Sequence, residues 1–234
     1  MAILIYGKNP VLEAINAKRK VYELYVLDTL KDEWIKDLEK ENIKIKRLNK
    51  QKMNQMFSTT HQGLGALVED YKTISLEDAL AKEDKKLFIM LDSVEDPHNL
   101  GAIIRSADAF HASGVIIPKH RSVQITPTVV KVSTGAIEYV DVISVTNLNQ
   151  AIKTLKAHNV WVVGTDLETE QGLESIHADT DLCIVLGSEG KGLSRLIKDN
   201  CDYLVKIPMK GHVNSLNVSV SCGILLHDII RRRG

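Results

Sequence analysis

The chain has 234 residues, 44% of them hydrophobic, which is enough for one large domain or two smaller ones around a real core. Thirty basic and thirty acidic residues cancel, which excludes a uniformly basic protein and confines any polyanion site to a local patch. The three cysteines lack metal-like or CxxC spacing. We therefore expect no metal site, and buried, reduced thiols in a cytoplasmic protein. We also expect no signal peptide or membrane span, because the apolar start of the chain, 1–5, is too short for either.

Residues 1–72 alternate β-rich runs with helical patterns and predict a small α/β module. The expected strands are 3–6, 23–27, 43–47 and 65–71, and the expected helices are 10–17, 32–41 and 50–56. A basic window around Lys44, Lys46 and Arg47 can neutralise backbone phosphates of RNA, although a solvated structural surface is an equally good interpretation. His61, in a polar turn before the last strand, is a candidate for a base contact or simply a turn residue.

Residues 73–86 are charged and largely lose the apolar periodicity, so they predict a linker with one short helix. A second domain is expected over 87–234. Its first strand ends before Pro97, and Asn99 can cap the helix that follows. Arg105 lies within that helix among small residues. It can lean toward the carboxyl end of the strand, where open α/β sheets bind ligands, or form an ordinary surface salt bridge.

Further strands at 115–117, 142–145 and 160–164, with a helix at 149–158, predict an α/β fold with a mainly parallel sheet. The apolar run 183–186 then enters a glycine loop, Gly187-Ser188-Glu189-Gly190-Lys191-Gly192. This loop is not a Walker motif, because neither Ser nor Thr follows the lysine. Glu189 would also repel a pyrophosphate. A cofactor loop and a plain strand-to-helix turn are the two interpretations that remain.

Three segments taken together resemble the motifs of the SpoU (TrmH-type) RNA 2′-O-ribose methyltransferases of the SPOUT superfamily. They are DSVEDPHNLGAIIRSA at 92–107, LGSEGKGL at 186–193 and NSLNVSVS at 214–221. Residues 1–72, which contain YGKNPVLEA near their start and HQG near their end, look like the ribosomal-protein-like substrate-binding domain of many members. The likeness is closest to the guanosine methyltransferases of large-subunit ribosomal RNA, and transfer-RNA enzymes share all three motifs.

The resemblance implies S-adenosyl-L-methionine as methyl donor, an RNA substrate, a C-terminal trefoil knot and a homodimer with active sites at the subunit interface. The cofactor residues it implies come from three loops and are Thr165, Gly187, Ile207, Met209 and Leu216. The catalytic residues it implies are Arg105 at the centre, with Asn99, Glu189, Ser215 and Asn217 around it.

Arg105 is a poor proton acceptor, because the pKa of a guanidinium lies above ~12. We therefore expect it to act as a cation that holds a phosphate and stabilises the forming alkoxide. Two rival functions stay open. One is an RNA-binding module without catalysis, and the other is a dinucleotide-dependent oxidoreductase, which the absence of a G-x-G-x-x-G after either first strand disfavours.

Overall fold

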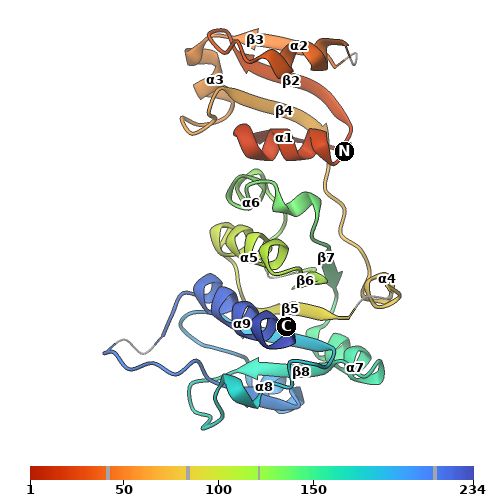
Figure 1. Ribbon diagram of the computed structural model, residues 1–234, viewed down its shortest axis with the longest axis vertical. Helices are drawn as coiled ribbons and strands as arrows, with labels where there is room; N and C mark the ends of the chain where they lie inside the picture. Colours follow the sequence, from red (N-terminus) through yellow and green to blue (C-terminus); the bar gives the residue numbers. More distant parts are fainter. Residues whose placement is uncertain (41–42, 83–84, 121, 213–214) are drawn as a thin grey trace. The chain divides into compact units, whose positions relative to one another are not determined.

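The computed structural model describes residues 1–40, 43–82, 85–120, 122–212 and 215–234 (Figure 1). The chain divides into two compact units. Unit 1 consists of Met1–Lys72 and Ile125–Tyr139, and unit 2 of Thr73–Gln124 and Val140–Gly234. Unit 1 is therefore discontinuous in sequence.

Unit 1 contains a four-stranded sheet in the order β1-β4-β2-β3. Strand β4 is antiparallel to both of its neighbours, and β3 runs parallel to β2. The strands are β1 (Ala2–Tyr6), β2 (Val21–Leu27), β3 (Ile45–Leu48) and β4 (Leu64–Glu69), and the helices are α1 (Lys8–Asn16), α2 (Glu33–Lys40) and α3 (Lys50–Met56). The predicted alternation of strands and helices is confirmed, with boundaries shifted by a few residues.

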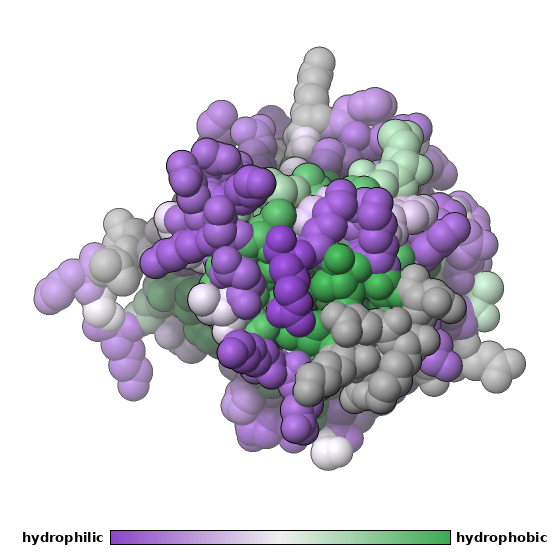
Figure 2. Space-filling model, turned by 90° about the horizontal axis from the view of Figure 1, so that it is seen from above, coloured by the Kyte–Doolittle hydropathy of each residue, from purple (hydrophilic) through white to green (hydrophobic). Residues whose placement is uncertain are grey.

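Aromatic packing fixes α3 against this sheet. The ring of Phe57 lies 5.5 Å from that of Tyr25, measured between centroids, and both side chains are buried with Met53. A β-carbon on Gly65 would overlap the Phe57 ring, so β4 needs glycine at that position. Hydrophilic residues make up most of the face seen in Figure 2 and surround a hydrophobic area.

The segment 125–139 carries helix α6 (Pro127–Val132) and the turn η1 (Ala136–Glu138). Glu138, whose side chain is 2% exposed, accepts hydrogen bonds from Arg19 Nε at 2.8 Å and from Tyr71 Oη at 2.5 Å. The Arg19 guanidinium lies 3.9 Å from the centre of the Tyr71 ring. Burial raises the pKa of Tyr71, and the negative charge of Glu138 raises it further. A buried polar network thus joins the segment to the N-terminal sheet.

Unit 2 contains a six-stranded sheet in the order β10-β8-β9-β5-β6-β7, and all of its strand pairs are parallel. The strands are β5 (Leu87–Asp92), β6 (Gly114–Pro118), β7 (Val142–Val145), β8 (Trp161–Thr165), β9 (Leu182–Gly187) and β10 (Tyr203–Val205). The predicted α/β fold with a parallel sheet is confirmed. The trefoil knot stays a prediction.

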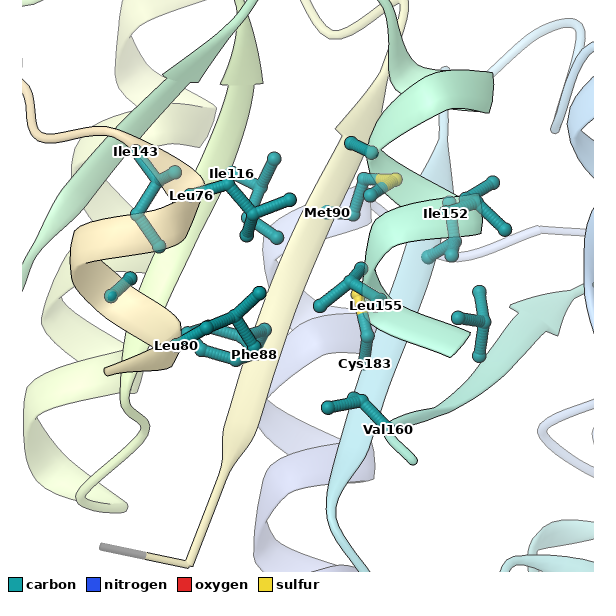
Figure 3. Close-up of a cluster of buried hydrophobic side chains, with 14 of the residues drawn as sticks. Leu76, Leu80, Phe88, Met90, Ile116, Ile143, Ile152, Leu155, Val160 and Cys183 are labelled. Carbon is teal, nitrogen blue, oxygen red and sulfur yellow. The ribbon is translucent and has the colours of Figure 1, made fainter. Parts of the chain in front are cut away.

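Helices cover both faces of this sheet (Figure 1). On one face, α4 (Leu76–Leu80) and α7 (Leu148–Ala157) pack on side chains of β5 and β9, as Figure 3 shows for Phe88 and Cys183. On the other, α5 (Pro97–Ala109) packs against α9 (Val218–Arg233). The remaining helical segments are η2 (Leu173–Ser175) and α8 (Arg195–Asn200). Among the described residues, no helix is both long and apolar enough to cross a membrane.

The segment 73–86 contains the one short helix expected there, α4. Its apolar side chains Leu76, Ala79 and Leu80 are buried in the core of unit 2. Just before it, Ile74 forms a parallel bridge to Ile143, which belongs to the edge strand β7. The described part of this segment is therefore packed structure of unit 2.

We predict that Glu138→Ala lowers the free energy of unfolding of unit 1 by about 3 kcal/mol, because it leaves the Arg19 guanidinium and the Tyr71 hydroxyl without their acceptor. Denaturant unfolding followed by the near-ultraviolet signal of tyrosine measures this loss. Lys72→Ala is the control, because it removes an exposed pair with Glu69 at 3.8 Å and should change stability by less than about 0.5 kcal/mol. Equal effects of the two substitutions would contradict the role given to the buried network.

Candidate functional site

Four strands of unit 2 end at the same edge of the parallel sheet. Register places Asp92 of β5 beside Gly187 of β9, and Thr165 of β8 beside Val205 of β10. The loops that follow these strands are consequently neighbours. This is the edge at which open parallel sheets bind ligands.

A pocket of about 280 Å³ lies among the loops after β8, β9 and β10 and the start of α9. All five residues implied for the cofactor line it, namely Thr165, Gly187, Ile207, Met209 and Leu216. Glu189 and Ser215 line it as well. Sequence reasoning missed Glu168 and Lys191, which also face this pocket. Their only signal in the sequence is that each lies in a loop directly after a buried strand.

The glycine loop folds back on the end of β9. Gly192 N donates to Ser188 O at 2.9 Å, and Gly192 has a φ of +63°, which favours glycine. A β-carbon on Gly187 would overlap the backbone of Gly192 and the nitrogen of Leu193. The sequence suggested that Gly187 lets a ligand approach the backbone. The structure shows that the loop itself already requires glycine there.

Asp92 holds the far end of the same loop. This carboxylate is 6% exposed, and its Oδ2 accepts a hydrogen bond from Ser194 N at 2.7 Å. Ser194 precedes α8, so one side chain of β5 fixes the connection from β9 to that helix. The loop is thus held at Gly187 by close packing and at Ser194 by a buried carboxylate.

Asn99, Glu189 and Asn217 form a closed hydrogen-bonded ring, which we call the Asn-Glu-Asn ring. Glu189 Oε1 accepts from Asn99 Nδ2 at 3.0 Å and from Asn217 Nδ2 at 2.5 Å. Asn217 Nδ2 also donates to Asn99 Oδ1 at 2.9 Å. The three residues come from the three motif segments, so the ring joins α5, the glycine loop and the start of α9.

The two asparagines differ in their relation to the helices. Asn217 caps α9, because its Oδ1 accepts from Ser219 N at 2.9 Å. The expectation that Asn99 caps α5 is wrong. Asp96 is the cap, with its Oδ1 accepting from His98 N at 2.8 Å, and the helix begins at Pro97. Because Asp96 does the capping, the amide of Asn99 is left to reach Glu189.

The structure does not bring Arg105 to the other implied catalytic residues. Six positions along a helix correspond to about 9 Å of rise and place the side chain about 120° around the axis from Asn99. Arg105 is exposed, does not line the pocket, and makes no hydrogen bond or ion pair with any residue that the structure describes. Within one chain, its guanidinium is a free surface cation.

An ion pair stabilises the loop after β8. Lys198 of α8 pairs with the carboxylate of Asp166. Burial raises the pKa of Asp166, but the Lys198 ammonium and two backbone N–H groups outweigh it, so the pKa lies below its ordinary value. Thr165 Oγ1 donates to Val185 O at 3.2 Å, which ties the same loop to β9. These contacts preorganise one wall of the pocket.

In unit 1, the basic window is partly neutralised. Glu23 on β2 accepts from Lys44 Nζ at 2.7 Å and from Lys46 Nζ at 2.8 Å, both on or beside β3. These bonds, together with one from Tyr25, lower the pKa of Glu23 to about 2. Arg47 donates to Leu30 O at 3.0 Å. The window thus has a carboxylate counterion that its local sequence does not reveal.

His61 has a structural task in this unit. It is 5% exposed, its Nδ1 accepts from Gly63 N at 2.8 Å, and its Nε2 lies 3.0 Å from Asn54 Oδ1. Burial lowers the pKa of His61, and the charges of Lys131 and Lys50 lower it further. Both ring nitrogens are occupied, so His61 shapes its turn and is not exposed to contact a base.

The third motif begins at Asn214, which lies outside the described residues. Within the described ranges, no group of three or more His, Cys, Asp or Glu side chains could hold a metal ion. The three cysteines are free thiols.

We predict that Gly187→Ala lowers the free energy of unfolding by about 2 kcal/mol, because the new methyl group overlaps the backbone of Gly192 and Leu193 and forces the loop to shift. Gly190→Ala in the same loop is the control. A β-carbon there would meet nothing within 4 Å, so stability should be unchanged. Denaturant titration of both variants measures the difference, and a Gly187→Ala protein as stable as the wild type would show that the loop is not closed in this way.

Comparison with known proteins shows the family of the chain. The model of the SpoU rRNA Methylase family matches residues 86–227, and a model described as RNA 2′-O ribose methyltransferase substrate binding matches residues 4–74. YacO of Bacillus subtilis, described as a TrmH family tRNA/rRNA methyltransferase on a provisional basis, is 42% identical over 237 residues, covering 98% of this chain and 95% of its own.

Two solved structures share the fold over nearly the whole chain. The SpoU methyltransferase AviRb from Streptomyces viridochromogenes, in complex with AdoMet, has a TM-score of 0.86 at 24% identity and covers 99% of this chain and 90% of its own. An AdoMet-bound rRNA methyltransferase from Sinorhizobium meliloti has a TM-score of 0.84 at 23% identity, and the match covers 99% of this chain and 87% of that protein. With both of its parts matched by family models and a relative aligned along almost its full length, this chain belongs to the SpoU (TrmH-type) family of RNA methyltransferases.

Proposed function

We propose that this protein transfers a methyl group from S-adenosyl-L-methionine to a ribose 2′-hydroxyl of structured RNA, and that the target is a guanosine of large-subunit ribosomal RNA. One observation carries the proposal. The pocket at the sheet edge gathers the cofactor residues of three loops, and the Asn-Glu-Asn ring shares Glu189 with its wall. The ribosomal target is supported by the description of the matching family.

The pocket suits a partly apolar cofactor that carries charges of both signs. Ile207 and Leu216 supply apolar faces, while the glycine loop supplies backbone groups that can hydrogen-bond an adenine and a ribose. Three acidic and three basic side chains line the pocket, namely Asp166, Glu168, Glu189, Lys191, Lys198 and Lys206, so a zwitterionic ligand with an amino and a carboxylate group finds a partner for each. When bound there, S-adenosylmethionine would supply the reactive methyl group on its sulfonium.

The residues of the chain have to align the acceptor hydroxyl, take up its proton and stabilise its oxygen. The Glu189 carboxylate, which lines both pockets and accepts from the amides through Oε1 alone, is the base that this wall offers for the proton. The Asn-Glu-Asn ring fixes the Glu189 carboxylate through two amide donors, so its position is set before the substrate arrives. Ser215 lines the pocket beside Leu216 and can anchor the methionine end. A cation beside the forming alkoxide is still needed.

Arg105 supplies that cation if the site is completed by a second copy of the chain. It is exposed on α5, which packs against α9, and α9 also exposes Val220 at 49% of its surface. We infer that these helices form the interface of a homodimer and that Arg105 of each subunit reaches the ring of its partner. There the guanidinium would hold the neighbouring phosphate and stabilise the alkoxide.

Unit 1 would capture the RNA, in agreement with the substrate-binding model that matches it. Lys44, Lys46 and Arg47 are exposed, and phosphates can replace Glu23 as the partner of the two lysines. We do not include His61 among these contacts, because it is buried. A ribosomal RNA substrate and free thiols both suit the cytoplasm. Mapping ribose methylation in RNA from cells lacking the protein separates ribosomal from transfer RNA.

We predict that Leu216→Ala weakens binding of S-adenosylmethionine about tenfold, because the substitution removes apolar contact area from the pocket. Isothermal titration calorimetry measures the dissociation constant. Leu196→Ala is the control, because Leu196 is 66% exposed on α8 and does not line the pocket. Unchanged binding in Leu216→Ala would remove this loop from the cofactor site, and no binding by the wild type would refute the proposed cofactor.

We predict that two inactive variants restore activity when their subunits are mixed. In a shared site, an Arg105→Ala subunit supplies an intact ring and a Glu189→Gln subunit supplies the arginine. Half of the randomly formed dimers are mixed and each holds one complete site, so about a quarter of wild-type methylation should return. Incorporation of labelled methyl groups into RNA, after co-refolding of the two variants, measures it.

The control for this experiment mixes Glu189→Gln with Asn217→Ala. Both residues belong to the ring of one chain, so each mixed dimer lacks a complete site and no activity should return. If the first mixture stays as inactive as the second, Arg105 does not act across a subunit interface.

A further inference from the structure

A second pocket, of about 230 Å³, adjoins the first. The two share Ser188, Glu189 and Val218, so these residues form a common wall. The rest of the second pocket comes mainly from residues 93–96, between β5 and α5, and from Asn99. A group bound here would lie beside the proposed methyl donor, with Glu189 between them.

The position of this pocket in the sheet is one that favours ligands. Strands β5 and β9 are neighbours, but the chain continues from β5 to β6 on one side and from β9 to β10 on the other. The loops after β5 and β9 therefore diverge and leave a crevice at the carboxyl ends of the strands. Ligands of open α/β sheets bind at such a switch point. The second pocket lies in this crevice.

The charges of its lining restrict what it can bind. Glu95, Asp96 and Glu189 contribute carboxylates, and no Lys or Arg side chain is among the described residues that line it. A phosphate is consequently disfavoured. Metal binding is disfavoured too, since these carboxylates do not form a group that could hold an ion, within the described residues. The lining therefore suits a group that donates several hydrogen bonds to carboxylates, and among the parts of an RNA the uncharged nucleoside is the one that offers such donors.

Only some of the carboxylate oxygens in the second pocket accept hydrogen bonds from the protein itself. Asp96 Oδ1 caps α5, and Glu189 Oε1 accepts the two asparagine amides. Glu95, in contrast, is exposed and forms no hydrogen bond or ion pair with any residue in the described ranges. Among the described residues that line the pocket, it is the carboxylate with both oxygens free to accept.

We propose that the second pocket receives the target nucleoside, turned out of the RNA, and that Glu95 selects guanine by accepting hydrogen bonds from N1–H and from the N2 amino group. This inference rests on the proposed methyltransferase function. Guanine is the RNA base whose pairing edge presents two adjacent N–H donors, and a carboxylate offers two matching acceptors. Enzymes that act on a nucleotide commonly read its extruded base along this edge.

The arrangement also explains the acidic lining. The phosphates of the RNA would remain outside the pocket, where cations such as Arg105 can hold them, while the neutral nucleoside enters. The ribose would then approach the shared wall at Glu189 and Val218, across from the donor. Base selection and methyl transfer are assigned to opposite ends of one pocket.

The test uses the full-length protein, S-adenosylmethionine and an RNA oligonucleotide that carries the mapped target as guanosine or as inosine, which lacks the N2 amino group. The wild type should methylate the guanosine RNA with a kcat/KM about tenfold or more above that for inosine. Glu95→Ala should lose about tenfold or more on guanosine and reduce the guanosine-to-inosine ratio to about one. Glu77→Gln, an exposed carboxylate on α4 outside both pockets, should behave as the wild type.

Calorimetry with S-adenosylmethionine alone separates this inference from the proposed function. Glu95→Ala should bind the cofactor as the wild type does. A Glu95→Ala enzyme with wild-type kcat/KM on guanosine and an unchanged ratio would overturn the role of Glu95 while leaving the methyltransferase intact. A wild type that methylates neither RNA from the mapped site nor total ribosomal RNA would instead refute the proposed function.

Discussion

The site depends on the close approach of the glycine loop to the end of β9. No side chain fits at Gly187, because the backbone of Gly192 and Leu193 occupies the place of a β-carbon. Asp92, from the neighbouring strand, accepts from Ser194 N and fixes where the loop leaves for α8. Glu189 is carried on the loop between these two points. The placement of the only carboxylate in the Asn-Glu-Asn ring is therefore set by packing at a glycine and by one buried hydrogen bond.

The Asn-Glu-Asn ring connects the Glu189 carboxylate to two helices, α5 and α9. Asn217 uses its amide nitrogen for Glu189 and its amide oxygen to cap α9, so one side chain links the carboxylate to the start of the last helix. Asn99 makes the corresponding link to α5. Because α5 and α9 also pack on each other, the ring lies where both helices are already fixed. A hydrogen-bonded network with every amide in use favours a single arrangement over a flexible one.

Sequence reasoning succeeded where local patterns decide the structure and failed where distant partners do. The apolar runs 87–92 and 183–186 predict central parallel strands because both of their faces are apolar, and they lie in β5 and β9. The convergence of Thr165, Gly187 and Leu216 followed from a family resemblance, since loops far apart in sequence carry no local sign of contact. The cap assigned to Asn99 belongs to Asp96, because both residue types cap well and only the helix start distinguishes them. The pairing of Glu23 with Lys44 and Lys46 depends on the β2–β3 register, which local propensity does not set.

The discontinuity of unit 1 determines how the two units can be studied separately. The segment 125–139 lies in the sequence span of the catalytic domain, but Val129, Val130 and Ile137 are buried and the segment clusters with residues 1–72. Removing residues 1–72 would take away the partners of Glu138 and expose this apolar surface to water. A truncated protein that failed to bind RNA or cofactor would then report lost packing as much as lost contacts. Point substitutions at exposed positions such as Lys44, Lys46 and Arg47 leave this packing in place, so a loss of RNA binding in those variants can be assigned to the surface itself.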